Sequence, residues 1–219
     1  MSRPLSRAVL LLGAIMLSGS IKMGAQAGEA PLGAQPLTFR VRVYNDEGVP
    51  EEVLVAARKT SEAVLDKVGV RPIWHNCTVG AANRDNLNCD DHPTKIDLVV
   101  YLVPRLEDHT THVERNALGY SIIPGHGEPA TMAYVSYARV KLVWSAFRSE
   151  DLLALAMVHE IGHLLLGTNG HSRYGIMRAP WPSRYLESGY WEEFAFTREQ
   201  TKRMQIVCRN RAGEMRAAQ

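Results

Sequence analysis

The segment 149–167 limits the possible folds of this chain more than any other stretch of the sequence. Ser149 opens it and two acidic residues follow. An apolar run then extends to Leu166, interrupted by two histidines, a glutamate and a glycine, and Gly167 comes next. A polar cap, early acids and a terminal glycine mark helix boundaries, so we predict a helix over 149–166 capped by Ser149. Imidazoles are costly to bury in such apolar surroundings without a partner, and a metal ion is such a partner.

Hydrophobic periodicity predicts the other elements. Apolar and polar side chains alternate over 37–44, which is typical of a strand with one buried face, and a nearly continuous apolar run at 96–103 is typical of a strand buried on both faces. Strands joined through a helix favour parallel pairing. The predicted strands are 37–44, 70–74, 96–103, 117–122 and 131–137, and the predicted helices are 50–68, 149–166 and 198–211, the last opened by a capping box at Thr197–Gln200.

Length and charge exclude several classes of protein. The 219 residues suffice for one domain, and a composition of 46% hydrophobic and 22% charged residues is that of a globular protein. After residue 27 the chain carries 22 basic and 23 acidic residues, so it lacks the basic surface that nucleic-acid binding needs. We therefore expect no nucleic-acid partner.

The N-terminus has the pattern of an export signal. Two arginines precede an apolar run over 8–21, and the small residues of 25–27 form a cleavage site before Gly28. We predict a signal peptide at 1–27 and a secreted or periplasmic protein, with an uncleaved anchor as the alternative. No other stretch approaches the roughly 20 apolar residues that a transmembrane helix needs, so no stable membrane insertion is expected after cleavage.

Three cysteines remain for the exported protein. Cys77 and Cys89 enclose a polar loop that a disulfide would constrain in an oxidising compartment, which would leave Cys208 unpaired. The alternative is that all three stay reduced, because cysteine spacing alone does not fix connectivity.

The histidines of the 149–166 helix have the spacing of metal ligands. His159 and His163 are four residues apart, so they lie on one helix face and can converge on one Zn²⁺ at about 2.0–2.1 Å. Glu160 lies beside them in the place of a general base that takes a proton from acidified water. His171 follows a turn and can supply a third imidazole, and three protein ligands leave the open position of a catalytic zinc.

Two alternatives apply to this interpretation. A glutamate from the segment of Glu192 and Glu193 could replace His171 as the third ligand. Alternatively, the two helix histidines are ordinary helix residues and Glu160 is a solvated acid, because the short pattern also arises by chance.

Three short motifs resemble those of the metzincin zinc peptidases, and in particular their matrixin-like branch. They are His-Glu-Ile-Gly-His at 159–163, His-Ser at 171–172 and Gly-Ile-Met at 175–177. In that family the third histidine lies six residues after the second, whereas His171 lies eight residues after His163. One extra residue in the helix and one in the turn would account for this difference.

The resemblance implies a zincin-like α+β fold for the chain. Its expected parts are a twisted five-stranded mixed sheet, mostly parallel with one antiparallel edge strand, two long helices, and a small C-terminal subdomain with a Met-turn and a final helix. Residues 28–219 would form one metallopeptidase domain, divided into an N-terminal subdomain at 28–166 and a C-terminal subdomain at 167–219. Met177 would lie beneath the metal as a hydrophobic floor.

The resemblance also implies residues that bind substrate. The edge strand 117–122 would pair with an extended peptide, and the segment 177–182 would line the pocket for the side chain after the scissile bond. Tyr185 or Tyr190 would help to stabilise the oxyanion, with ordinary packing as the alternative. The substrate-binding candidates are Leu118, Gly119, Tyr120, Pro180 and Trp181.

Some matrixin loops hold an additional metal ion. Asp108, His109, His112 and His126 fall in the corresponding loops of this chain, so they are candidates for a second, structural zinc or a calcium ion. The alternative is that they belong to solvated loops.

The function predicted from these features is that of a secreted zinc endopeptidase acting on a peptide or protein substrate. The alternative is a non-catalytic zinc- or peptide-binding module on the same fold, and a third reading is an exported structural protein with an accidental motif.

Overall fold

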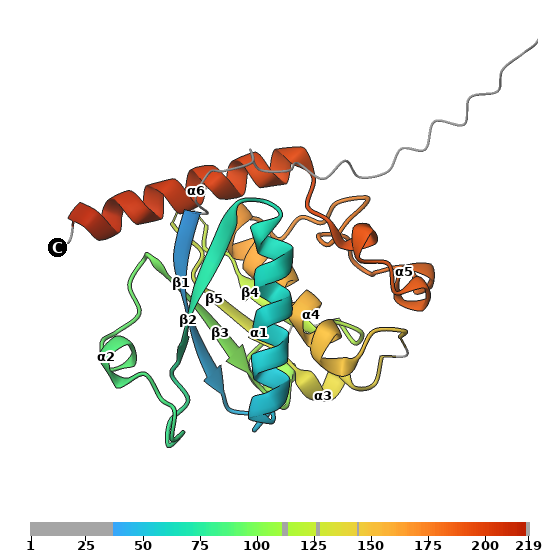
Figure 1. Ribbon diagram of the computed structural model, residues 1–219, viewed down its shortest axis with the longest axis horizontal. Coiled ribbons are helices and arrows are strands. Elements are labelled where there is room, and N and C mark those ends of the chain that lie inside the picture. The colour runs from blue at the N-terminus through green and yellow to red at the C-terminus, as the bar shows by residue number, and fades with distance from the viewer. Residues whose placement is uncertain (1–36, 111–113, 126–127, 144, 218–219) are drawn as a thin grey trace, which may run out of the picture.

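The computed structural model describes residues 37–110, 114–125, 128–143 and 145–217. Its fold is α+β, built on one five-stranded sheet with the strand order β2-β1-β3-β5-β4 (Figure 1). Four strands are parallel, and the edge strand β4 runs antiparallel to β5. The strands are β1 (Leu37–Asn45), β2 (Val70–Asn76), β3 (Asp97–Leu102), β4 (Gly119–Ile122) and β5 (Met132–Val135). The predicted mixed sheet with one antiparallel edge strand is thus confirmed.

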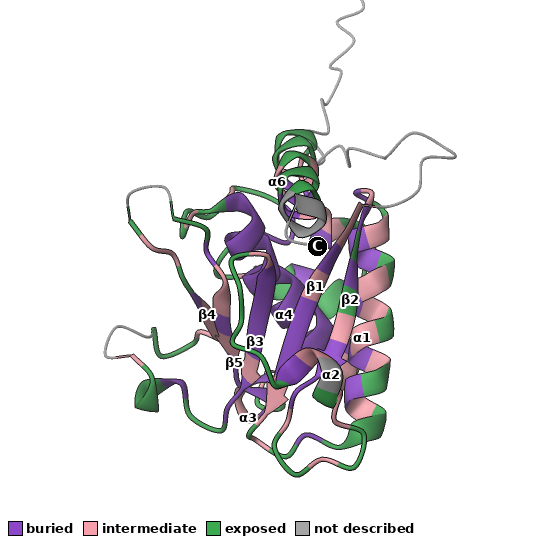
Figure 2. Ribbon diagram, turned by 90° about the vertical axis from the view of Figure 1, so that its left-hand side faces the viewer, coloured by how far each residue is buried: buried purple, intermediate pink, exposed green. Residues whose placement is uncertain are grey.

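Two long helices cover one face of the sheet, and a third crosses one end of it (Figures 1 and 2). The covering helices are α1 and α4, which pack against each other, and the crossing helix α6 contacts both β1 and α4. The helices are α1 (Glu51–Asp66), α2 (Asn86–Cys89), α3 (Tyr137–Val140), α4 (Ser149–Leu166), α5 (Ser183–Ser188) and α6 (Arg198–Ala217), with single 3₁₀ turns η1 (Leu106–Asp108) and η2 (Trp191–Phe194).

Helix α4 has the predicted bounds but not the predicted cap. Arg148, in extended conformation, holds the cap position and makes no side-chain cap hydrogen bond, so the assignment of Ser149 as the cap is wrong. The Ser149 hydroxyl instead contacts the Tyr137 hydroxyl at 3.1 Å. Gly167 ends the helix with a left-handed φ of 62°, as its place in the sequence indicates.

Other boundaries differ more from the sequence prediction. The strand predicted over 131–137 stops at Val135, because the Ser136 hydroxyl accepts a hydrogen bond from the Arg139 amide and begins α3. Helix α6 extends beyond residue 211 to Ala217. Its predicted capping box is present. The main-chain N–H of Gln200 donates to Thr197 Oγ1 at 3.2 Å, and the main-chain N–H of Thr197 donates to Gln200 Oε1 at 2.8 Å.

The two faces of the sheet follow from the alternation in β1. Val41 and Val43 are fully buried in the core, and Figure 2 shows β1 buried over much of its length. The alternating side chains of Arg40 and Arg42 belong to the opposite face, where Arg42 donates to Asp97 Oδ2 at 3.1 Å and Arg40 pairs with Asp97 Oδ1 at 2.8 Å. Asp97 is fully buried, so the two arginines supply the countercharge that a buried carboxylate needs.

Four tyrosines form a ladder across the sheet. Tyr44, Tyr101, Tyr134 and Tyr120 stand directly opposite one another on four neighbouring strands. Their stacked rings have centroid separations of 4.9, 5.1 and 4.9 Å. Cross-strand aromatic pairs stabilise a sheet and specify its register, so the ladder fixes the edge strand β4 relative to the core strands.

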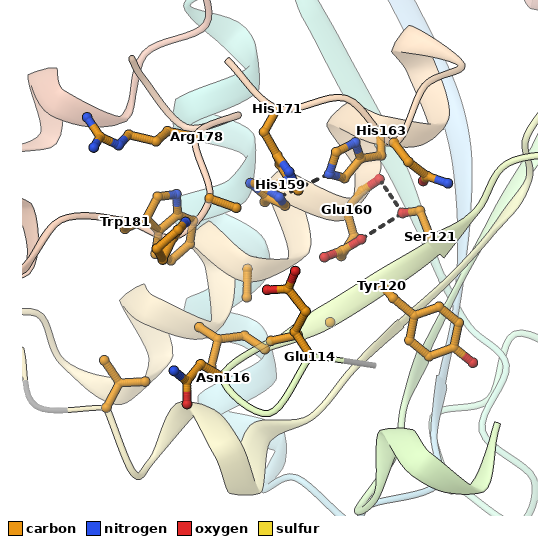
Figure 3. Close-up of a pocket in the computed structure, with 18 of the residues that line it drawn as sticks. Glu114, Asn116, Tyr120, Ser121, His159, Glu160, His163, His171, Arg178 and Trp181 are labelled. Carbon is orange, nitrogen blue, oxygen red and sulfur yellow. Dashed lines mark hydrogen bonds between the residues drawn. The ribbon is translucent and has the colours of Figure 1, made fainter. Parts of the chain in front are cut away.

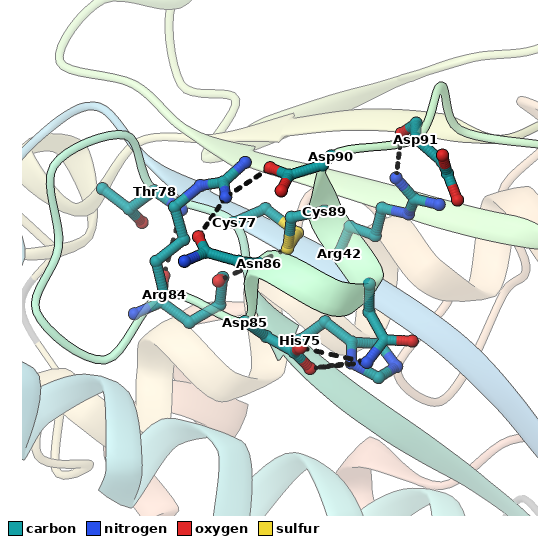
Figure 4. The surroundings of a disulfide bond; sticks show 12 residues. Arg42, His75, Cys77, Thr78, Arg84, Asp85, Asn86, Cys89, Asp90 and Asp91 are labelled. Carbon is teal, nitrogen blue, oxygen red and sulfur yellow. Dashed lines mark hydrogen bonds and ion pairs between the residues drawn. A yellow bond between two sulfur atoms is a disulfide. The ribbon is translucent and has the colours of Figure 1, made fainter.

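A disulfide closes the loop after β2. Cys77 and Cys89 are bonded with a Cα–Cα distance of 5.3 Å, while Cys208 is free and buried. Figure 4 shows polar contacts around this bond: His75 Nδ1 lies 2.6 Å from Asp85 Oδ2, and Arg42 Nη1 donates to the Asp91 carbonyl at 2.6 Å. The loop is therefore tied both to its own strand and to the face of the sheet.

The predicted signal peptide at 1–27 lies outside the described residues. Within the described part of the chain, every helix is too short or too polar to cross a bilayer.

We predict that reduction of the Cys77–Cys89 disulfide lowers the free energy of unfolding by about 3 kcal/mol. A disulfide that closes a loop of about 15 residues contributes about that much by restricting the unfolded chain, and this loop is of similar size. Urea titration of the metal-free protein with and without reductant measures this. The Cys208→Ala protein should respond to reductant as the wild type does, and the Cys77→Ala/Cys89→Ala protein should not respond. Equal stability of the oxidised and reduced wild-type proteins would contradict the prediction.

Candidate metal centre

Three histidines from α4 and the following loop converge at one point. His159 and His163 lie one turn apart on α4, the left-handed Gly167 then turns the chain, and His171 comes back over the pair (Figure 3). One ring nitrogen of each histidine lies within 4.8 Å of the others. The Nε2 atoms of His159 and His163 are 3.1 Å apart, close to the roughly 3.3 Å expected for two ligands on a tetrahedral ion at 2.0–2.1 Å.

Main-chain carbonyls orient the two helix histidines. His159 Nδ1 donates to the Ile176 carbonyl at 2.7 Å, and His163 Nδ1 donates to the Thr168 carbonyl at 2.7 Å. A carbonyl only accepts, so Nδ1 carries the proton in both rings and each Nε2 keeps a free lone pair. This arrangement of a ligand nitrogen backed by an acceptor on the other side of the ring is typical of metal-bound histidine.

The donor set fits a divalent cation. Two Nε2 lone pairs at 3.1 Å repel each other, and a cation between them would turn that repulsion into attraction. Burial lowers the pKa of His159 to about 3, with the charges of His163 and His171 adding to the effect, and burial lowers the pKa of His163 to about 4. Both imidazoles are therefore neutral at neutral pH, as metal ligands must be. His171 is exposed and leaves the site open on the solvent side.

Glu160 is a buried carboxylate beside the histidines. Burial raises its pKa to about 8, against the opposing effect of a hydrogen bond from Ser121. Ser121 Oγ lies 2.7 Å from Glu160 Oε2 and 3.0 Å from the Glu160 carbonyl oxygen, so the edge strand β4 holds this side chain in place (Figure 3). Gly119 makes the approach possible, because a Cβ there would lie 2.5 Å from the Tyr134 carbonyl oxygen and 2.9 Å from Glu160 Cγ.

Met177 lies under the helix that carries the histidines. It is fully buried, and its sulfur is 2.4 Å from where a Cβ at Gly162 would stand. The neighbouring Ile176 carbonyl accepts from both His159 Nδ1 and Trp181 Nε1, the latter at 3.0 Å. The 176–181 segment thus supports the site by packing on α4 and by orienting one ligand.

A cleft of about 600 Å³ opens beside the histidines. All five predicted substrate-binding residues line it: Leu118, Gly119, Tyr120, Pro180 and Trp181. The Tyr120 side chain itself points away from the histidines in Figure 3, and burial raises its pKa to about 12. Apolar side chains of Val143, Ala156 and Leu186 complete the wall.

Other predicted residues lie elsewhere. Glu192 and Glu193 belong to η2 and to none of the potential metal-binding groups among the described residues. Tyr185 is buried against Phe194 and Tyr190 is 66% exposed, and neither is among the described residues that line the cleft.

The candidate second metal site is only partly visible. Asp108 lies 3.5 Å from Arg105 in an exposed ion pair, and the His109 ring stacks on Tyr134 with a centroid distance of 4.7 Å. His112 and His126 lie outside the described residues. In the described ranges no second group of potential ligands accompanies Asp108 and His109.

Sequence reasoning missed several members of the site. Glu114 lines the cleft, Ser121 holds Glu160, and the two carbonyl acceptors belong to Thr168 and Ile176. Arg178 also lines the cleft, within the segment 177–182 that the resemblance implied. Strand periodicity would have placed Ser121 on the solvent face, because the apolar residues of this strand occupy the alternate positions 118, 120 and 122. The carbonyl acceptors leave no trace in side-chain patterns.

No protein-family model matches the sequence, and comparison with curated proteins gives no match either. The functional argument therefore rests on the geometry of this site.

We predict opposite effects for alanine at two helix glycines. Gly162→Ala forces a Cβ against Met177 and should lower the free energy of unfolding by about 1–3 kcal/mol, the usual cost of overpacking. Gly213→Ala in α6 meets nothing within 4 Å and should raise it by about 0.5–1 kcal/mol through helix propensity. Urea titration of both variants checks this. Equal shifts at the two positions would contradict the packing described for Met177.

We also predict that the protein binds one divalent metal ion through the three histidines. Loss of a residue that hydrogen-bonds to a metal ligand weakens metal binding about ten- to hundredfold. Replacement of His171, a ligand itself, by alanine should weaken binding by more than that. Competition with a chromophoric chelator measures the affinity. Glu192→Gln and Glu193→Gln serve as controls and should bind as the wild type does. Wild-type affinity in His171→Ala would contradict the assignment of the third ligand.

Proposed function

We propose that this protein is a zinc-dependent endopeptidase with a zincin-like fold of the metzincin type. The observation that carries the proposal is a triad of histidines, two with free Nε2 atoms held 3.1 Å apart, beside the buried carboxylate of Glu160 in an open cleft. Three ligands from the protein and an exposed side are what a catalytic metal requires, whereas a structural zinc is enclosed by four.

His159, His163 and His171 are the proposed ligands. Imidazole nitrogens suit zinc among the common divalent ions, although copper, nickel and iron accept them as well. When bound, zinc supplies Lewis-acid polarisation of the scissile carbonyl and lowers the pKa of water.

Glu160 is the proposed general base and proton shuttle. Ser121 engages Oε2, so Oε1 is the oxygen that can take a proton from attacking water and pass it to the leaving nitrogen. A raised pKa makes the carboxylate a stronger base than an exposed glutamate, and burial by α4 and β4 limits its contact with bulk water.

The outer edge of β4 is the proposed binding strand for a peptide. The Leu118 carbonyl accepts from the Ser136 amide at 2.9 Å, so the alternation of an antiparallel ladder turns the main-chain groups of Gly119 and Ser121 outward. A substrate in extended conformation could pair with these groups and lie across Glu160. The wall of Pro180 and Trp181 would face its side chains.

The tight segment around Met177 supports assignment as the Met-turn, with residues 167–219 as the C-terminal subdomain. Its close packing on Gly162 supports a role for Met177 as the hydrophobic floor beneath the metal. Continuation of α4 for three residues after His163, before Gly167, accounts for part of the long spacing to His171.

Secretion or periplasmic export is proposed from the signal pattern at 1–27. The disulfide between Cys77 and Cys89 supports an oxidising compartment.

We predict that Glu160→Ala abolishes cleavage of an unbiased peptide library while the protein still binds one metal ion. The reason is that Glu160 moves protons but is not a ligand. Mass spectrometry of the products, together with metal analysis of the same sample, tests both parts. Chelation of the wild-type protein should abolish cleavage as well.

Glu192→Ala is the matched control, since Glu192 is an exposed glutamate outside the described lining of the cleft. It should cleave as the wild type does. A folded, zinc-loaded wild-type protein that cleaves nothing would refute the peptidase proposal and favour a non-catalytic binding module. Undiminished cleavage by Glu160→Ala would refute the role of Glu160.

A further inference from the structure

We propose that Glu114 selects substrates with a cationic side chain, lysine or arginine, on one side of the scissile bond. This inference rests on the proposed peptidase function and adds a substrate class to it. The residue lies in the cleft but takes no part in holding the metal or in proton transfer.

Glu114 is held at a fixed place by its main chain. Its carbonyl accepts from the Ala117 amide at 3.0 Å, which forms a turn directly before β4. Arg139 Nη1 clamps the same turn, at 3.3 Å from the Glu114 carbonyl oxygen and 2.8 Å from that of Ala117. The turn that carries Glu114 is therefore fixed relative to the edge strand, and the exposed carboxylate extends from it.

The Glu114 carboxylate is left without a countercharge. Arg139 is the nearby cation, but its Nη2 pairs with Glu107 and its Nη1 serves the carbonyls of the turn. Among the described residues, the Glu114 carboxylate has neither an ion-pair nor a hydrogen-bond partner. It lines the cleft and points into it in Figure 3.

No cation elsewhere in the described lining of the cleft offsets this charge. Arg178 is the one arginine in that lining, and its Nη1 donates to the Arg173 carbonyl at 3.1 Å. Its guanidinium points away from the histidines in Figure 3 and lies 6.0 Å from the centre of the Tyr185 ring. The unpaired charge that the described lining of the cleft presents to a substrate is therefore the carboxylate of Glu114.

A lysine or arginine side chain matches both the charge and the wall. Ala117 and Leu118 line the cleft next to Glu114, so the methylene stem can lie on apolar surface while the charged end reaches the carboxylate. A peptide paired antiparallel to β4 places residues after the cut beside Glu114, and a parallel one places residues before it. The position of the selected residue thus reports the direction of binding.

The test is cleavage of a peptide library blocked at both ends by wild type, Glu114→Gln and Glu114→Lys. Wild type should prefer lysine and arginine at one position about two- to fivefold in kcat/KM, the range of an exposed charge pair. Glu114→Gln should lose this preference, and Glu114→Lys should favour aspartate and glutamate. The preference should shrink in high salt because the pair is exposed.

Matched controls isolate the carboxylate. Glu187→Gln alters an exposed glutamate outside the described cleft lining and should keep the wild-type profile. The same peptides with free amino termini separate recognition of a side chain from recognition of a terminal amine. A preference that needs the free terminus would overturn the side-chain proposal.

Binding of the peptides to the zinc-loaded Glu160→Ala protein separates this inference from the peptidase proposal. If wild type and Glu114→Gln cleave peptides with the same profile, the selection by Glu114 is overturned and the peptidase proposal stands. Basic peptides that bind through Glu114 but are never cut overturn the peptidase function and support the selection. If the protein shows no cleavage and no charge-dependent binding, both proposals are overturned.

Discussion

Two hydrogen bonds from imidazole Nδ1 atoms to main-chain carbonyls are the constraint on which the candidate centre depends. Through them, His159 is tied to Ile176 and His163 to Thr168, so the loop after α4 cannot shift without turning a ring. The same bonds leave both Nε2 lone pairs pointing at one place. Orientation of the site is thus a property of the main chain, whereas the sequence motif specifies only which side chains are available.

The sequence predicted those features that depend on short-range periodicity. The bounds of α4, the five strands and the ligand spacing of His159 and His163 all follow from patterns within one element. The convergence of His171 on this pair agrees with the prediction, because a glycine stop and a short turn leave a returning chain little freedom. The mixed sheet with one antiparallel edge strand agrees with the expectation as well.

Features made by contacts between distant segments could not be predicted in the same way. Ser121 meets Glu160 across 39 residues of sequence, and Arg139 reaches the turn of Glu114 across 25. Short helices such as α2 and α5 have too few residues for a periodic pattern. The wrong cap at Ser149 has a local cause, since its hydroxyl found a competing partner in Tyr137.

The edge strand β4 has a further consequence for the behaviour of the protein in solution. A free sheet edge invites pairing with a second copy of the same chain, and natural proteins restrict such edges by keeping them short. β4 has four residues, and the tyrosine ladder holds it in one register against β5. An edge of this length presents few main-chain groups to another molecule, so self-association through it gains little. The short edge strand β4 is thereby a poor nucleus for aggregation.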